Sequence, residues 1–278
     1  MTQVEKAEQF RALHRRPQPL LLPNAWDVPS ARLFEEAGFP AVATSSAGLM
    51  VSLGYPDGEV MPRRELVRTV ARIASRLAIP LSADIVAGYG RTPRDCAATA
   101  KMILRAGAIG INLEDGHHSA GSLAPAPGQV KKLKAIRAAA SATGVPLVIN
   151  ARTDALRYAP GDPETKLREA IDRLIAYRDA GADCVYPMGL SDAASIQTVV
   201  DALDFPVNVM VRPGLPPVAE LERIGVKRIS FGPSASYAAL GLLRRASEEI
   251  REYGTYSTLT EGALTFDELN RLALPRRP

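Results

Sequence analysis

Short apolar runs alternate with longer amphipathic segments along most of this chain, and this alternation constrains the fold more than any other feature. Runs rich in Val, Ile, Leu and Ala are typical of buried strands, whereas apolar residues three or four positions apart indicate helices packed on those strands. A repeated strand–helix order predicts a parallel sheet covered by helices. Strands are predicted at residues 19–22, 41–45, 81–84, 109–114, 147–152, 184–187, 207–211 and 228–231.

Helix-end signals lie between these strands. Thr92 and Asp162 each precede a proline, an arrangement that favours a helix start. Gly38, Gly107 and Gly181 follow the ends of amphipathic segments, where a left-handed residue often ends a helix. The predicted helices cover residues 29–37, 63–77, 93–105, 129–143, 163–180, 191–203, 216–224 and 235–253.

Eight strand–helix units in 278 residues predict an α/β fold, specifically a (β/α)8 barrel of the TIM type. A doubly wound dinucleotide-binding sheet is disfavoured, because Gly88 and Gly90 are not followed by a third glycine that opens a helix. We expect residues 1–278 to form a single barrel domain. Residues 1–16 are expected to add an N-terminal helix, and residues 254–278 a C-terminal helical extension that could exchange between subunits.

The composition and the charge pattern indicate which classes of partner are not expected. Hydrophobic residues make up 46% of the chain and charged residues 23%, a balance typical of globular proteins. No apolar run approaches the roughly 18 residues of a membrane-spanning helix. The formal net charge of +4 is not gathered in a basic stretch interleaved with aromatic residues, so neither a membrane nor a nucleic acid is expected as a partner. The distant Cys96 and Cys184, with no visible secretory signal, favour a cytoplasmic location.

Charged residues end three predicted strands whose other positions are mostly apolar. Asp84, Glu114 and Arg152 each follow a polar residue two positions earlier, so each polar pair shares one face of its strand. The carboxyl ends of barrel strands meet at one rim, where TIM barrels assemble their active sites. Two carboxylates and a guanidinium there predict an oxyanionic substrate held near Mg²⁺. Either carboxylate alone could equally cap a helix or pair with an arginine.

Other candidates carry open alternatives. His117 and His118 lie in the Gly/Ser/Pro-rich segment 116–128, which is typical of a mobile lid, and either could transfer a proton or simply be an exposed loop residue. Trp26 could wall the pocket, Tyr55 could donate a hydrogen bond or pack, and Arg212 could bind a second carboxylate or form a surface salt bridge.

These polar segments resemble the isocitrate lyase/phosphoenolpyruvate mutase superfamily, in particular its smaller mutase-like branch. The matching segments run in the expected order from about residue 20 to about residue 245. They include LPNAWD at 22–27, TSSAG at 44–48, LGYPD at 53–57, NLEDG at 112–116 and INARTD at 149–154.

The resemblance implies a (β/α)8 barrel, often a tetramer whose last helix swaps between subunits. It implies chemistry on 2-oxo or 2-hydroxy acids through a Mg²⁺-stabilised enolate. By position, the loop of Ser45, Ser46 and Ala47 would bind the substrate carboxylate, Asp84 would bind the metal with Asp57 and Glu114 in its hydrated shell, and Arg152 would bind the substrate oxyanion.

The chain departs from this family pattern at three places. The lyases carry a Lys-(Lys/Arg)-Cys-Gly-His motif after the fourth strand, whereas residues 116–123 read GHHSAGSL and contain neither that cysteine nor the lysine and asparagine of the mutase. Val86 replaces a second metal-shell carboxylate, and Met188 replaces a position that is often Glu or His. Methionine and valine cannot bind Mg²⁺, so the metal is expected to be weakly bound or substrate-assisted, and a metal-free site built on Arg152 stays open.

The leading interpretation is a lyase that cleaves a C–C bond of a small 2-oxo or 2-hydroxy carboxylate. Phosphonopyruvate mutase or hydrolase chemistry at a P–C bond is one alternative, and a degenerate, non-catalytic metabolite-binding barrel is another. The expected partners are a small anionic carboxylate and further copies of the chain, as a dimer or tetramer.

Overall fold

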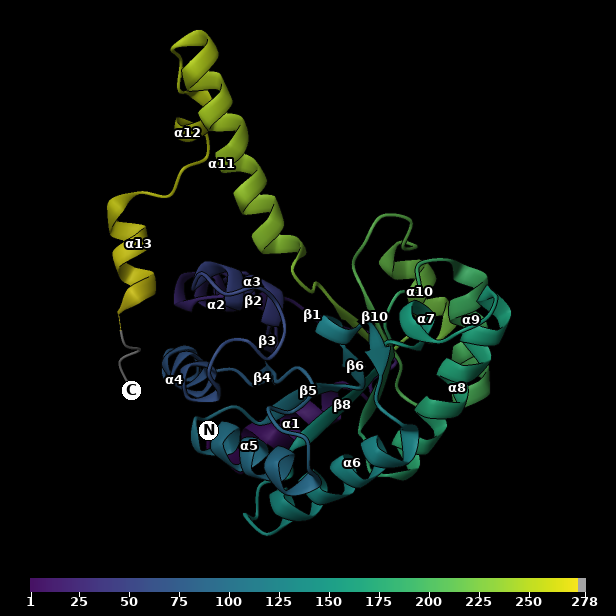
Figure 1. Ribbon diagram of the computed structural model, residues 1–278. Coiled ribbons are helices and arrows are strands. Elements are labelled where there is room, and N and C mark those ends of the chain that lie inside the picture. Colours follow the sequence, from purple (N-terminus) through teal and green to yellow (C-terminus); the bar gives the residue numbers. More distant parts are fainter. Residues whose placement is uncertain (275–278) are drawn as a thin grey trace.

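The computed structural model describes residues 1–274, so the last four residues of the predicted 254–278 extension lie outside the described part. Parallel strands pair side by side around a closed ring (Figure 1). Strands β2, β3, β4, β5, β8 and β9 pair in that order, as do β1, β11 and β10. A parallel bridge between Val185 and Val207 joins the two groups, and β1 continues into β2 across Pro23. The predicted (β/α)8 barrel is therefore confirmed.

The break at Pro23 has a simple cause. Proline has no N–H to donate to the ladder, although its carbonyl oxygen still accepts from the Ala43 N–H at 2.8 Å. The barrel strands are β1 (Leu20–Leu22), β2 (Asn24–Ala25), β3 (Val42–Thr44), β4 (Leu81–Asp84), β5 (Gly110–Glu114), β8 (Val148–Thr153), β9 (Cys184–Pro187), β10 (Asn208–Met210) and β11 (Arg228–Ser230).

Helices cover the outside of the ring and begin where the capping signals predict. Thr92 accepts from the Asp95 N–H at the start of α5, and Asp162 accepts from the Thr165 N–H at the start of α8. The helices after the strands are α2 (Val28–Glu36), α4 (Arg63–Ala74), α5 (Pro93–Arg105), α6 (Ala126–Ser141), α8 (Pro163–Asp179), α9 (Ala193–Leu203), α10 (Val218–Ile224) and α11 (Ser234–Tyr253).

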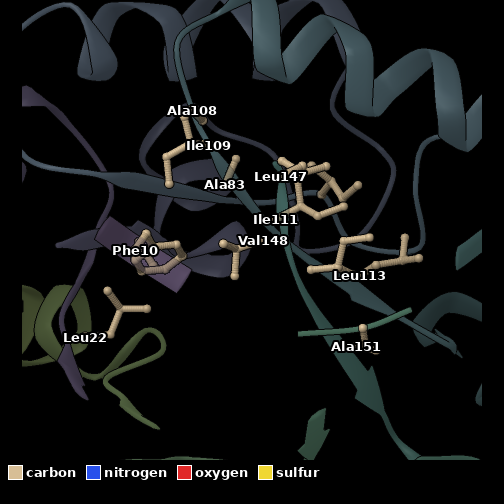
Figure 2. Packing of buried hydrophobic residues seen from close by; sticks show 14 of the residues in the cluster. Phe10, Leu22, Ala83, Ala108, Ile109, Ile111, Leu113, Leu147, Val148 and Ala151 are labelled. Carbon is tan, nitrogen blue, oxygen red and sulfur yellow. The ribbon is translucent and has the colours of Figure 1, made fainter. Parts of the chain in front are cut away.

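The N-terminal helix α1 (Gln3–Leu13) packs against the strands, and its Phe10 is fully buried. A Cβ on Gly110 would lie 2.7 Å from the Phe10 ring, so only glycine leaves room for this ring beside β5. Figure 2 draws Phe10 in one packed cluster with Ala83, Val148 and other strand residues. The predicted extra N-terminal helix is thus part of the barrel core.

Three short elements near the strand ends escaped prediction. Helix α3 (Ser46–Ser52) starts directly after β3, and α7 (Ala155–Tyr158) starts directly after β8. Between β5 and α6 the glycine-rich segment forms a small antiparallel hairpin of β6 (Gly116–His117) and β7 (Ser122–Leu123), with a 3₁₀ turn at His118–Ala120. Such elements are too short to show a helical or strand period in the sequence.

Beyond the barrel the chain continues as a helical extension. Helix α11 projects away from the barrel and carries α12 (Ser257–Thr260) at its far end, and the chain then returns through α13 (Phe266–Ala273) to lie beside α2 (Figure 1). Arg271 Nη2 lies 3.3 Å from Glu36 Oε2, and Leu272 is buried. Exchange of this segment between subunits stays a prediction. No helix among the described residues is both long and apolar enough to cross a membrane.

Candidate active site

A cavity of about 350 Å³ opens at the carboxyl ends of the barrel strands. Its wall combines strand-end side chains with residues from α3, α7 and the loop after β11. This is the rim at which the sequence predicted a site. Of the predicted site residues, those that line the cavity are Ser45, Ser46, Ala47, Asp57, Asp84, His118 and Arg152.

Asp84 is held in place by strand register. Asp84, Asn112 and Asn150 are Cα partners across β4, β5 and β8, so their side chains lie on one face of the sheet. The Asn150 amide donates to Asn112 Oδ1 at 2.8 Å, and the Asn112 amide donates to Asp84 Oδ1 at 3.2 Å. The Ser46 N–H donates to Asp84 Oδ2 at 3.1 Å. Oδ2 accepts this one bond among the described residues, so it keeps accepting capacity at the cavity that Asp84 lines.

The turn after β4 explains why valine at position 86 is compatible with this site. Val86 has a φ of 53°, a strained conformation for a β-branched residue. Its N–H donates to Asp84 Oδ1 at 3.2 Å, and its carbonyl oxygen accepts from the Glu114 N–H at 2.9 Å. The backbone at this position therefore holds the Asp84 carboxylate and the main chain of Glu114, and neither contact uses the valine side chain.

Arg152 lies between two carboxylates. Its Nη1 is 2.8 Å from Glu114 Oε2, while Nε and Nη2 donate to the two oxygens of Asp154 at 3.1 and 2.6 Å. Glu114 and Asp154 are almost completely inaccessible to solvent. Asp154 makes no side-chain cap for α7 and instead binds the guanidinium through both of its oxygens.

Asp115 holds the backbone of Asp154 in position. It accepts from the Asp154 N–H at 2.9 Å, from the Tyr177 hydroxyl at 2.6 Å and from Arg173 Nη1 at 3.1 Å. Thr153 adds a hydroxyl donor at 2.8 Å. This fully buried network joins β5, β8 and α8, and so positions the carboxylate that orients Arg152.

A proton-carrying chain adjoins this ion-pair cluster. His118 Nε2 lies 2.7 Å from Glu114 Oε1, and His118 Nδ1 lies 3.0 Å from the Tyr158 hydroxyl. Burial raises the pKa of the Glu114 carboxyl, although the Arg152 charge opposes this shift. The hydrogen bond to Glu114 raises the pKa of His118. Glu114 and His118 can therefore share a proton near neutral pH, the property expected of an acid–base pair.

Two sets of side chains could hold a divalent cation. One ligand atom each from Glu114, His118 and Asp154 lies within 4.8 Å of the others. Arg152 contacts both carboxylates of this set, so a cation there would meet a fixed positive charge at short range. This set does not fit Mg²⁺ in the arrangement observed.

Asp84 and Asp57 fit Mg²⁺ better. Both line the cavity, and in the part of the chain that the structure describes neither forms an ion pair. Burial is the main cause that raises the pKa of Tyr89, and the charges of Glu59, Asp84 and Asp57 raise it further, so these carboxylates lie near the same phenol. Mg²⁺ needs only one or two protein carboxylates, because water and substrate complete its octahedron.

Besides the buried Glu114, four predicted residues do not line the cavity. The Tyr55 hydroxyl donates to Glu65 Oε2 at 2.9 Å, and Arg212 is exposed and donates to the Gly189 carbonyl at 2.6 Å. Trp26 packs on the core, and His117 is exposed on the neighbouring surface hollow that Asp57 also lines. Their roles in binding or catalysis stay predictions.

Sequence reasoning missed several residues of the cavity wall. Arg157 and Tyr158 come from the unpredicted helix α7, and Tyr237 comes from the start of α11. Asn208, Arg228 and Ser230 are polar residues inside predicted strands, and the period-two rule applied to the last two strands could have singled them out.

Comparison with known proteins agrees with this geometry. A family model described as phosphoenolpyruvate phosphomutase matches residues 10–251. The chain belongs to the isocitrate lyase/phosphoenolpyruvate mutase superfamily. The 2-methylisocitrate lyase of Bacillus subtilis (strain 168) is 30% identical over 265 residues, which cover 91% of this chain and 84% of that protein.

Solved structures of superfamily members share the fold. Oxaloacetate acetylhydrolase in complex with the inhibitor 3,3-difluorooxalacetate has a TM-score of 0.84 and 26% identity, covering 96% of this chain and 93% of that chain. The superfamily member 2,3-dimethylmalate lyase has a TM-score of 0.83 and 26% identity, covering 96% and 94%. The chain is thus an enzyme of a superfamily of C–C lyases and mutases, which argues against the non-catalytic alternative.

Proposed function

We propose that this enzyme is a lyase that cleaves a C–C bond of a small 2-oxo or 2-hydroxy carboxylate through an enolate. The observation that carries the proposal is the meeting of Asp84, Arg152 and His118 around one cavity at the barrel rim, with the buried Glu114 paired to both Arg152 and His118. A divalent cation held by Asp84 and Asp57 would polarise the substrate carbonyl and stabilise developing negative charge.

The loop after β3 offers one free backbone donor for a substrate carboxylate. The Ser45 N–H donates to the Ala25 carbonyl, and the Ser46 N–H donates to Asp84. The Ala47 N–H, in the first turn of α3, is therefore the amide of this loop that we assign to the substrate. Arg152 would stabilise the oxyanion electrostatically from its position between Glu114 and Asp154.

The proton transfer is assigned to a relay rather than to His118 alone. Both ring nitrogens of His118 are engaged, one by Glu114 and one by the Tyr158 hydroxyl. Tyr158 also lines the cavity. A proton stored on the Glu114–His118 pair can thus reach an enolate carbon through the Tyr158 oxygen, which passes its own proton on and is reprotonated by His118.

The proposal is tested with Arg152→Ala, assayed with a panel of 2-oxo and 2-hydroxy carboxylates in the presence of Mg²⁺. Loss of a positioned charge that stabilises an oxyanion lowers kcat/KM by about 100-fold or more. Arg251→Ala removes an exposed charge on α11 and serves as the control, with activity expected to stay at the wild-type level. Turnover by Arg152→Ala within a few-fold of wild type would exclude this role.

The P–C alternative is tested in the same assay. Phosphonopyruvate is added to the panel, and inorganic phosphate and phosphoenolpyruvate are measured alongside the carbonyl products. Formation of phosphate (hydrolase) or of phosphoenolpyruvate (mutase) from phosphonopyruvate, with no cleavage of any carboxylate, would replace the lyase proposal by the P–C one.

The two free, buried thiols of Cys96 and Cys184 are compatible with a reducing compartment. We propose the cytoplasm as the location, with a homodimer or homotetramer as the working form.

A further inference from the structure

Arg228 is a buried cation that forms no ion pair within residues 1–274. It opens β11, where it is paired in register with Leu20 of β1 and Asn208 of β10, and its side chain lines the floor of the active-site cavity. The residue is 2% exposed, and among the described residues Nε and Nη1 have no hydrogen-bond partner. Burying a charge without partners is costly, so a guanidinium in this state points to a ligand that completes it.

The groups around Arg228 do not neutralise it. Burial raises the pKa of the Cys184 thiol to about 12 and also raises that of the Tyr186 phenol, so both are uncharged at neutral pH. Burial and the Arg228 charge lower the pKa of His14 to about 3, so this ring is neutral as well. Asp84 is the nearby carboxylate, and its oxygens already accept from Ser46, Val86 and Asn112.

Arg152 and Arg228 differ in how many of their guanidinium nitrogens already have partners. Arg152 places three nitrogens against Glu114 and Asp154. Two buried nitrogens of Arg228, Nε and Nη1, have no hydrogen-bond partner among the described residues, and neither do the amide oxygens of Asn150 and Asn208, two other residues that line the same cavity. Donors for an anion and acceptors for the water or hydroxyl that accompanies it therefore lie together on the cavity floor.

We propose that Arg228 forms an anion subsite in the barrel interior that binds a carboxylate of the substrate remote from the reacting carbon. This deepens the function proposed above and rests on it: the enzyme would select substrates that carry a second acidic group. The sequence suggested Arg212 for this task, but Arg212 is exposed and bonded to the Gly189 carbonyl.

The test uses two probes that differ in one carboxylate. Malate and 2-hydroxybutyrate are both four-carbon 2-hydroxy acids, and only malate has a terminal carboxylate. Their binding is measured by calorimetry in Mg²⁺ for wild type, Arg228→Met, Arg228→Lys and the control Arg251→Met. We expect Arg228→Met to weaken malate binding about 10- to 100-fold. Binding of 2-hydroxybutyrate should change less than about threefold, because its one carboxylate meets other residues. Arg228→Lys should recover part of the malate affinity.

Thermal unfolding without ligand separates this role from a structural one. If Arg228 binds a ligand and is unpaired in the free protein, Arg228→Met removes an unpaired buried charge. The midpoint temperature of the ligand-free variant should then stay the same or rise. A lower midpoint together with an equal loss of affinity for both probes would overturn the subsite. Wild-type stabilisation by sodium chloride alone, absent in Arg228→Met and not increased by malate, would assign the arginine to a resident inorganic anion and would also overturn it.

The readouts distinguish this subsite from the proposed reaction. Arg228-dependent preference for malate, with no cleavage of any carboxylate, would contradict the lyase function and leave the subsite standing. If no dicarboxylate from oxalate to adipate stabilises wild type more than Arg228→Met, the subsite is excluded even when turnover is found.

Discussion

At the scale of single residues, the site shows how partners change what a side chain can do. Arg152 alone would be a free oxyanion binder, but Glu114 and Asp154 fix its plane and offset its charge. His118 alone would be an ordinary titrating imidazole, but Glu114 on one nitrogen and Tyr158 on the other make it the middle of a relay. The reactive behaviour belongs to these contacts.

Tyr158→Phe tests the relay with minimal disturbance of shape. The variant removes the hydroxyl that joins His118 to the cavity, so kcat should fall about 100-fold or more, while KM changes little. Tyr253→Phe, on the exposed end of α11, is the matched control and should leave both constants unchanged. An unaltered kcat in Tyr158→Phe would show that a group other than the Tyr158 hydroxyl transfers the proton.

Because the His14 ring is buried and its pKa is lowered, we expect the protein to lose stability in acid. Its Nδ1–H donates to the Phe10 carbonyl at 2.8 Å, and burial, followed by the charge of Arg228, lowers its pKa from 6.5 to about 3. Below pH 6.5 the unfolded chain takes up a proton that the folded chain refuses. The free energy of unfolding should therefore decrease by up to about 1.4 kcal/mol per pH unit as the pH falls from 6.5 toward 3.

The measurement for His14 is urea denaturation of wild type and His14→Leu at pH 7, 6, 5 and 4. The variant should be less sensitive to acid over this range, although other groups still titrate. Parallel pH profiles for the two proteins would show that His14 does not titrate differently in the folded and unfolded states.

At the scale of elements, glycine at one strand position allows a helix to join the core. A Cβ on Gly110 would lie 2.7 Å from the Phe10 ring and 2.9 Å from Ser82 Oγ. Gly110→Ala should therefore destabilise the protein by about 1–3 kcal/mol through overpacking between α1 and β5. Chemical denaturation would measure this loss.

Phe10→Leu provides the matched test of that contact. If the Gly110 methyl acts by displacing α1, the double variant Phe10→Leu/Gly110→Ala should lose less stability than the sum of the two single losses. Strict additivity would place the strain elsewhere, for example at Ser82.

At the scale of the whole molecule, α11 projects from the barrel (Figure 1), and several of its large apolar side chains are exposed to solvent. Exposed apolar patches of this kind mark interfaces, in agreement with the predicted homo-oligomer. Helix α13 packs on α2 instead of covering α11. The exposed apolar side chains of α11 are Tyr237, Leu240, Leu242, Leu243, Ile250 and Tyr253.

Replacing Leu240 and Leu243 together by glutamate should shift the protein toward monomer, because like charges would meet where apolar side chains pack. Sedimentation velocity of wild type and variant measures the change, and Lys101→Ala, a change at an exposed residue of α5, should keep the wild-type assembly. A wild type that sediments as a monomer at every concentration would contradict the prediction.

The sequence by itself determined the order of the strands, the barrel and the rim positions of Asp84, Glu114 and Arg152, because period-two spacing and helix caps are local signals. It did not reveal that Asp154 binds Arg152, that Tyr158 reaches His118 from 40 residues away, or that Arg228 stays unpaired inside the barrel. Only the tertiary structure decided these points, because strand register and the packing of short helices choose which distant side chains meet.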